Sequence, residues 1–157
     1  MQQKKALAVI RIRGSVNIRK DIKDTLKMLR LTKANHCVIL PSVPDYIGML
    51  RKVKDYVTWG ELENDTLELL IKKRARLQGN IPLTEKWLKS NTIYHSFKEL
   101  ASALANCNVK YSELPIKPIL RLCPPRKGYE GIKRAYKVGG ALGYRGKAIN
   151  ELITRML

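Results

Sequence analysis

Acidic side chains are scarce in this chain of 157 residues. It has 13 Asp and Glu against 31 Lys and Arg, which gives a formal net charge of +18. A surface charged so one-sidedly repels itself and destabilises the compact state unless a polyanion neutralises it. Residues 1–78 hold 17 basic and 8 acidic side chains and residues 79–157 hold 14 and 5, so each half carries +9. This even spread predicts a body that touches RNA, DNA or an anionic membrane over several surfaces, and not a neutral domain with a basic tail.

Long apolar runs and paired cysteines are also missing. The longest apolar runs have the length of a core strand, whereas a membrane span needs roughly 20 residues. The three cysteines are Cys37, Cys107 and Cys123. They are odd in number and far apart, so they indicate neither a disulfide framework nor a metal site. We expect no membrane segment and no signal peptide, and a protein of the reducing cytoplasm.

Aromatic side chains make up only 6% of the chain, with Phe97 as the single phenylalanine. The RNA-recognition motif reads bases with several aromatic rings on its sheet. Phe97 falls on a predicted helix, so base stacking on a sheet surface is not expected. Binding should rest on phosphate contacts and on shape.

Residue patterns for catalysis are lacking too. The carboxylates fall mostly at predicted helix starts, His36 adjoins a predicted buried strand, and His95 has no partner at ligand spacing. The chain has no H-E-x-x-H motif, and its glycine-rich segment 139–146 lacks the G-K-[ST] ending of a phosphate-binding loop. We therefore predict that the chain is not an enzyme and takes no metal, cofactor or small-molecule substrate.

What the chain does have is a regular order of short elements in its first 60 residues. Strands are predicted at 6–13, 36–42 and 55–60, with helices at 17–31, where Asn17 is the candidate cap, and at 44–54. The alternation from Ile10 to Arg13 should put apolar groups on one face and cations on the other. This order predicts an α+β fold with a ferredoxin-like split β-α-β-α-β core, a small antiparallel sheet and helices on one side.

Residues 61–157 read as a helical and loop extension packed on that core. Helices are predicted at 62–78, after Thr84, from Ser96 to about 106 and from 146 to 157, with an edge strand at 118–123. Residues 117–147 hold nine cations, three tyrosines (Tyr129, Tyr136 and Tyr144) and a single acid, Glu130. We expect this basic loop to lie outside the core, to stack its tyrosines on bases and to become ordered only on RNA.

The predicted RNA contacts are cations at one strand end, two helix ends and the basic loop. They are Arg11, Arg13, Arg19, Arg51, Lys52, Lys54, Lys72, Lys73, Arg74, Arg76, Arg121, Arg126, Lys127, Lys133, Arg134, Lys137, Arg145 and Lys147.

Two segments carry a resemblance to a known family. Residues 6–60, with the run from Pro44 to Val53 (PDYIGMLRKV), and the later runs Leu122 to Gly128 (LCPPRKG) and Gly139 to Gly143 (GGALG) are similar to the universal large-subunit ribosomal protein family L-thirty, called L-seven in eukaryotes. The C-terminal runs are similar to its archaeal and eukaryotic branch, and the start close to the first strand favours the archaeal form. The resemblance implies a structural constituent of the 50S subunit that binds 23S rRNA near 5S rRNA and among neighbouring ribosomal proteins, and so supports ribosome assembly and translation.

Three other functions stay open at this point. A free-standing RNA-binding regulator or chaperone would be active outside any particle. An RNA-modifying enzyme would need a cofactor pocket or a clustered acid and base. A protein of the membrane surface would need a basic amphipathic helix with bulky aromatics on its apolar face.

Overall fold

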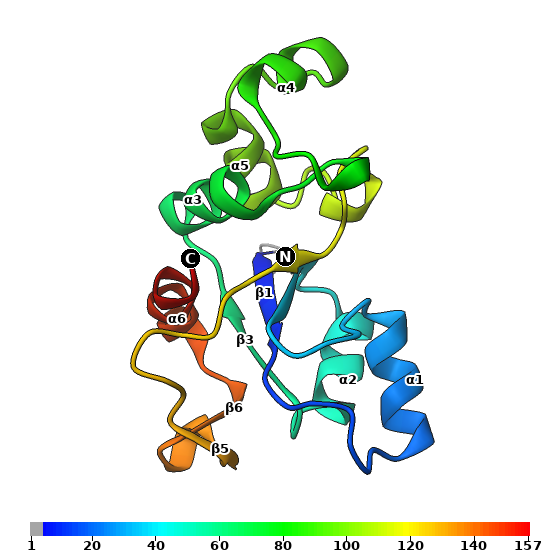
Figure 1. Cartoon of the computed structure of the whole chain (residues 1–157), viewed down its shortest axis with the longest axis vertical. Coiled ribbons are helices and arrows are strands. Elements are labelled where there is room, and N and C mark those ends of the chain that lie inside the picture. The colour runs from blue at the N-terminus through cyan, green and yellow to red at the C-terminus, as the bar shows by residue number, and fades with distance from the viewer. Residues whose placement is uncertain (1–4) are drawn as a thin grey trace.

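A mixed sheet of six strands runs through the molecule, in the order β4-β2-β1-β3-β6-β5 (Figure 1). The computed structural model describes residues 5–157. The strands are β1 (Ala6–Arg11), β2 (His36–Pro41), β3 (Val57–Glu61), β4 (Leu120–Arg121), β5 (Gly131–Ala135) and β6 (Gly140–Tyr144). The α-helices are α1 (Lys20–Met28), α2 (Pro44–Lys52), α3 (Asn64–Arg74), α4 (Glu85–Asn91), α5 (Phe97–Ala105) and α6 (Ile149–Met156). The predicted α+β class is confirmed.

The centre of the sheet is β1. It pairs antiparallel with β2, where Val9 lies opposite Val38, and antiparallel with β3, where Val9 lies opposite Trp59. Because both neighbours oppose β1, β2 and β3 run parallel to each other on its two sides. The three strands and two helices expected in the first 60 residues are all present.

Helices cover both faces of this sheet, and not one face as expected. Leu7 and Val9 of β1 pack with buried residues of α1 and α2, whereas Ala8 and Ile10 pack with α3, α5 and α6. Figure 1 shows α1 and α2 on one side of β1 and α6 on the other. The expectation of a cationic solvent face on β1 is therefore wrong. The strand is buried on both faces because the extension supplies a second apolar layer.

Several helix ends differ from the expected ones by a few residues. Asn17 does not cap α1, since the helix begins at Lys20 after Arg19 and Asn17 has a left-handed φ of 52°. Thr84 and Ser96 do cap α4 and α5, by accepting hydrogen bonds from the amides of Trp87 and Glu99. Within residues 5–157, no helix is long and apolar enough to cross a bilayer.

The segment 124–147 has more regular structure than expected. β6 pairs parallel with β3, and β5 pairs parallel with β6, so this part of the chain extends the sheet. Ala141 and Leu142 are buried and pack with Ile12. Gly140 permits the pairing, because a Cβ there would overlap the main-chain oxygen of Arg134. The prediction that 124–147 is an irregular loop outside the core is thus wrong for 131–144.

Candidate nucleic-acid interface

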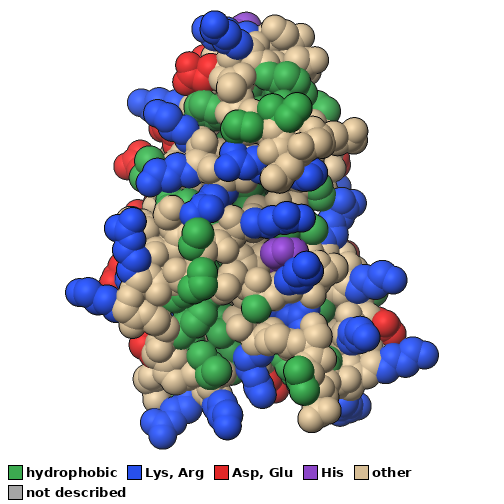
Figure 2. Space-filling model, in the orientation of Figure 1, with side chains coloured by type: hydrophobic (Ala, Val, Ile, Leu, Met, Phe, Trp, Pro, Cys, Tyr) green, Lys and Arg blue, Asp and Glu red, His purple; other side chains and the backbone are tan. Residues whose placement is uncertain are grey.

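Most of the predicted RNA contacts lie on the surface. Lys and Arg side chains extend over the whole face drawn in Figure 2, with few acidic side chains between them. Arg13, Arg74 and Arg76 are partly exposed, and Arg11 and Arg145 are buried. The fully exposed ones are Arg19, Arg51, Lys52, Lys54, Lys72, Lys73, Arg121, Arg126, Lys127, Lys133, Arg134, Lys137 and Lys147.

One group of cations lies where β1 ends beside the α2–β3 connection. Arg51 and Lys52 end α2, and Lys54 follows. The guanidinium of Arg13 lies 5.1 Å from the centre of the Tyr56 ring, and its main-chain amide donates to the Tyr56 carbonyl at 3.3 Å. Two segments about 40 residues apart therefore bring their cations to the same end of the sheet.

The cations at the end of α3 divide into two kinds. Lys72 and Lys73 are exposed, as a phosphate-binding surface requires. Arg74 instead folds back onto the C-terminal segment, where its Nη2 donates to the main-chain oxygen of Leu157 at 2.8 Å and contacts Cys123 Sγ at 3.1 Å. Arg74 therefore fixes α3 to the end of α6, and Lys72 and Lys73 make up the free part of this cluster.

Residues 131–139 form a projecting strand and turn that we call the basic flap. Every residue of the flap is exposed, including Lys133, Arg134 and Lys137. Tyr136 and Val138 are exposed beside these cations. The flap thus presents three charges and an aromatic ring on the outermost strand of the sheet, which suits contact with an RNA backbone and its sugars.

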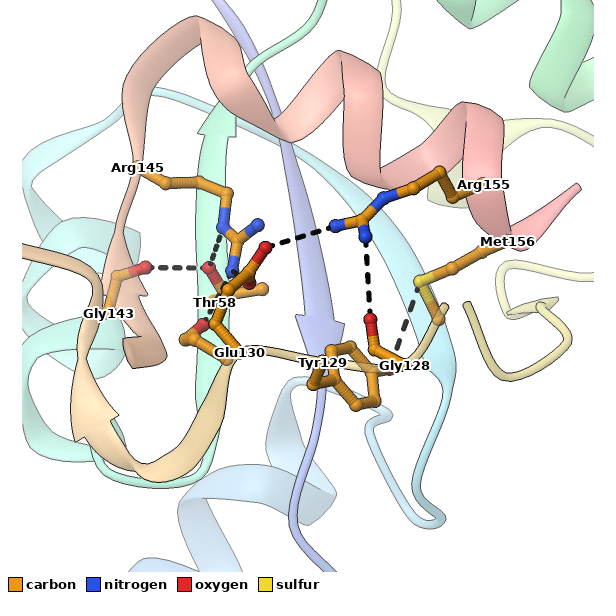
Figure 3. Close-up of polar contacts among 9 residues, drawn as sticks. Thr58, Gly128, Tyr129, Glu130, Gly143, Arg145, Arg155 and Met156 are labelled. Carbon is orange, nitrogen blue, oxygen red and sulfur yellow. Dashed lines mark hydrogen bonds and ion pairs between the residues drawn. The ribbon is translucent and has the colours of Figure 1, made fainter. Parts of the chain in front are cut away.

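Arg145 lies behind the flap and holds it to the sheet (Figure 3). Its side chain is buried, its Nε donates to Thr58 Oγ1 at 2.9 Å, and its Nη2 donates to the Ala141 carbonyl at 2.8 Å. The guanidinium also lies 4.8 Å from the centre of the Tyr136 ring. Burial lowers the pKa of Arg145, which Glu130 partly offsets. The prediction of an exposed phosphate contact here is wrong, because loop composition does not reveal acceptors supplied by β3 and β6.

Glu130, the single acid of the loop, joins two arginines. Its carboxylate lies 3.9 Å from Arg145 Nη2 and 3.3 Å from Arg155 Nη2, and Arg155 also donates to the Gly128 carbonyl (Figure 3). Tyr129 points inward, where its hydroxyl donates to Asn35 Oδ1 at 2.7 Å and burial raises its pKa to about 12. Tyr129 is therefore a structural residue and not one of the expected stacking surfaces.

Arg11 is the second predicted contact that the fold buries, with 3% of its surface exposed. Its guanidinium donates to the carbonyls of Leu31 at 2.7 Å and Arg13 at 2.9 Å and to Ser15 Oγ at 2.9 Å. The residue follows Val9 in the alternation of β1, so it points to the α1 side of the sheet. Arg11 therefore connects the end of β1 to the segments on either side of α1.

Three lysines that were not among the predicted contacts line a cleft beside Arg11. Lys20, Lys23 and Lys27 of α1 are exposed and border a hollow of about 610 Å³. Their spacing of three and four residues places them on one side of the helix, which could have been read from the sequence.

No arrangement suited to catalysis is found among residues 5–157. They contain no group of three His, Cys, Asp or Glu placed to hold a metal ion. His36 is buried, its Nδ1 lies 3.3 Å from Thr32 Oγ1, and burial together with Arg121, Lys33 and Arg11 lowers its pKa. It is a neutral core residue at physiological pH.

Comparison with known proteins agrees with this cationic, non-catalytic surface. The family model described as ribosomal protein L30p/L7e matches residues 7–57. The large ribosomal subunit protein uL30 of Methanocorpusculum labreanum is 55% identical over 150 residues, which are 95% of this chain and 98% of that protein. The chain belongs to the ribosomal protein L30p/L7e family. Its relative of the same name in Methanococcus maripaludis is 52% identical over 154 residues, 97% of this chain and 99% of that protein.

Membership in the L30p/L7e family confirms the resemblance noted from the sequence, including its archaeal form. The uL30 protein of Methanopyrus kandleri is 50% identical over 149 residues, 93% of this chain and all of that protein. These relatives match the extension as well as the region 7–57 that the family model covers. The L30p/L7e proteins are structural ribosomal proteins, so the prediction that the chain is not an enzyme is also confirmed.

Proposed function

We propose that the chain is a structural constituent of the large ribosomal subunit in the cytoplasm, where it binds 23S rRNA through phosphate and shape contacts, near 5S rRNA and beside neighbouring ribosomal proteins. The observation that carries the proposal is full-length similarity to proteins named as part of that subunit. The exposed cations of four separate segments support it, because each can neutralise RNA phosphate.

In this proposal, the ferredoxin-like β-α-β-α-β core of residues 1–60 is a rigid platform for residues 61–157. The basic loop 117–147 contacts RNA through the flap and through Arg121, Arg126, Lys127 and Lys147. Arg11, Arg74 and Arg145 have a different part, because their hydrogen bonds to the protein hold the cationic segments in place. The partner stays RNA and not a membrane, since the exposed aromatic residues are few and scattered.

Sedimentation of a tagged copy from cell lysate on sucrose gradients tests the proposal, first at low and then at moderate salt. We expect the protein in the fractions of the large subunit and of whole ribosomes, and we expect it to stay there at moderate salt. A tagged cytoplasmic enzyme in the same lysate is the control for trapping in heavy fractions. Recovery in the light fractions alone would contradict the proposal and favour the free-standing RNA-binding regulator.

A further inference from the structure

The cleft beside α1 has a strongly cationic lining. Its volume is about 610 Å³, and Arg11, Lys20, Lys23 and Lys27 line it with Asp24 as the single acid. Figure 2 shows Lys and Arg side chains gathered where Figure 1 places α1, on the opposite side of β1 from α6. The cleft is therefore a second cationic region, built from elements other than the flap.

The buried cation at this cleft has no carboxylate partner. Arg11 makes three hydrogen bonds to carbonyl and hydroxyl oxygens, and no described Asp or Glu forms an ion pair with it. The other buried arginine, Arg145, has Glu130 at 3.9 Å. A buried charge normally has a counter-charge, because desolvation disfavours it. Burial does lower the pKa of Arg11. An anion in the cleft would supply the missing negative charge.

The three lysines of α1 have the same need. They are spaced at i, i+3 and i+7, where side chains are neighbours on a helix and like charges repel. The single ion pair of α1 among the described residues joins Arg19 to Asp21, and the lysines take no part in it. Beside these cations the cleft is lined by the apolar side chains of Ile18, Leu26 and Leu31. The lining thus combines a surface for a base or sugar with groups for the adjoining phosphates.

We propose that this cleft binds one unpaired nucleotide of the ribosomal RNA together with its flanking phosphates. The inference rests on the proposed function and adds a specific contact to it. Unpaired nucleotides are the parts of RNA that proteins recognise most often, because their bases leave the stack and enter such hollows. Lys20, Lys23 and Lys27 bind the phosphates, and Ile18 contacts the base or the sugar. Ser15 and Thr32, which also line the cleft, provide hydroxyl groups for hydrogen bonds.

The salt dependence of binding to 23S rRNA tests the proposal. The variant Lys20→Gln, Lys23→Gln, Lys27→Gln removes three charges and keeps the length of the side chains. The control Lys86→Gln, Lys89→Gln, Lys98→Gln removes three exposed charges from α4 and α5. Each lost contact to a single-stranded phosphate lowers the slope of log K against log salt by about 0.7, so the cleft variant should lose about 2. The control should keep the slope of the original chain, and thermal melting checks that both variants fold.

The outcomes separate the two proposals. If the original chain binds 23S rRNA with a shallow salt slope, the proposed function itself fails. If it binds steeply but the cleft variant and the control lose the same slope, the lysines of α1 act only through net charge and the cleft proposal is overturned. Titration with adenosine monophosphate tests a free nucleotide as the source of the phosphate. Tight binding of this compound in the cleft, with an unchanged rRNA slope in the cleft variant, also overturns the proposal.

Amine acetylation of intact large subunits, read by mass spectrometry, gives an independent result. We expect Lys20, Lys23 and Lys27 to be protected in the particle and reactive in the free protein, whereas Lys86 and Lys89 are the comparison within the same chain. Reactive α1 lysines in the particle would overturn the proposal. Protection with an unchanged salt slope would do so as well, because a protein and not RNA would then cover the cleft.

Discussion

Arg145 has its guanidinium inside the molecule, where it replaces water with fixed partners. Thr58 Oγ1 and the Ala141 carbonyl accept its hydrogen bonds, and Thr58 in turn donates to the Gly143 carbonyl at 2.8 Å. A single side chain thus joins β3 to both ends of β6. Because the flap follows the chain of Glu130, whose carboxylate faces the same guanidinium, the position of the flap depends on this residue as well.

We expect Arg145→Met to lower the free energy of unfolding by about 2–4 kcal/mol, because it leaves buried acceptors without donors. Arg145→Lys should lose part of this stability, since an ammonium group cannot reproduce the planar fork of donors. Denaturation in urea measures both variants. The matched control is Arg126→Met in the same loop, where the side chain is exposed and the change should stay within about 0.5 kcal/mol. Equal losses at positions 145 and 126 would contradict the structural role of Arg145.

At the scale of single residues, charge and loop context predicted exposure well, and failed where tertiary acceptors decide. Lys133 and Lys137 are exposed as expected. Arg11 and Arg145 have similar local sequences of glycine and cations, but their acceptors lie on Leu31 and Thr58, which come close only in the fold. No local pattern distinguishes an arginine that binds the protein from one that is free to bind RNA.

The pairing of β5 with β6 depends on a glycine at one position. A Cβ at Gly140 would overlap the carbonyl carbon and oxygen of Arg134, whereas a Cβ at Gly131 would meet only the flexible side chain of Arg134 at 3.6 Å or more. Gly131 and Gly140 lie opposite each other in the two strands. The pair therefore offers two substitutions of equal size that should have unequal effects.

We expect Gly140→Ala to separate β5 from β6 and to lower the free energy of unfolding by about 1–3 kcal/mol, the usual range for overpacking. Hydrogen exchange should show that amides of β5 lose protection while those of β1 to β3 keep it. Gly131→Ala is the control and should change neither measurement much. Unchanged exchange in β5 of Gly140→Ala would mean that the flap does not depend on this close approach.

At the scale of elements, the sequence predicts what local periodicity determines. The first three strands, the helices, and the caps at Thr84 and Ser96 are of this kind. β5 and β6 were missed because residues 131–135 are all exposed and 139–143 is rich in glycine, so neither shows an alternating pattern. Their partner strand is β3, about 85 residues earlier at Thr58 and Gly143. Such a strand is determined by an available sheet edge and not by its own side chains.

The charge of the whole molecule sets a cost that no single residue shows. The chain has a net charge of +18, yet only four ion pairs form among its described residues, each with a partly or fully exposed carboxylate. Attraction between neighbouring charges therefore offsets little of the overall repulsion. Repulsion of this kind acts over tens of ångströms in dilute salt and is screened as ions are added. RNA would remove it altogether by neutralisation, and simple salt should remove part of it in the free protein.

We therefore expect the free chain to become more stable when potassium chloride rises from about 10 to about 150 mM, which shortens the screening length from about 30 to about 8 Å. A gain of about 1 kcal/mol would raise the melting temperature by about 2–4 °C for a chain of this size. The variant with Gln at positions 20, 23, 27, 86, 89 and 98 has a net charge of about +12, and since repulsion grows with the square of charge, its gain should fall to about half. If salt leaves both proteins unchanged or destabilises them, local ion pairs and not net repulsion control the stability of the free protein. In that case the bound RNA would contribute contacts to the folded state without also relieving a strain caused by charge.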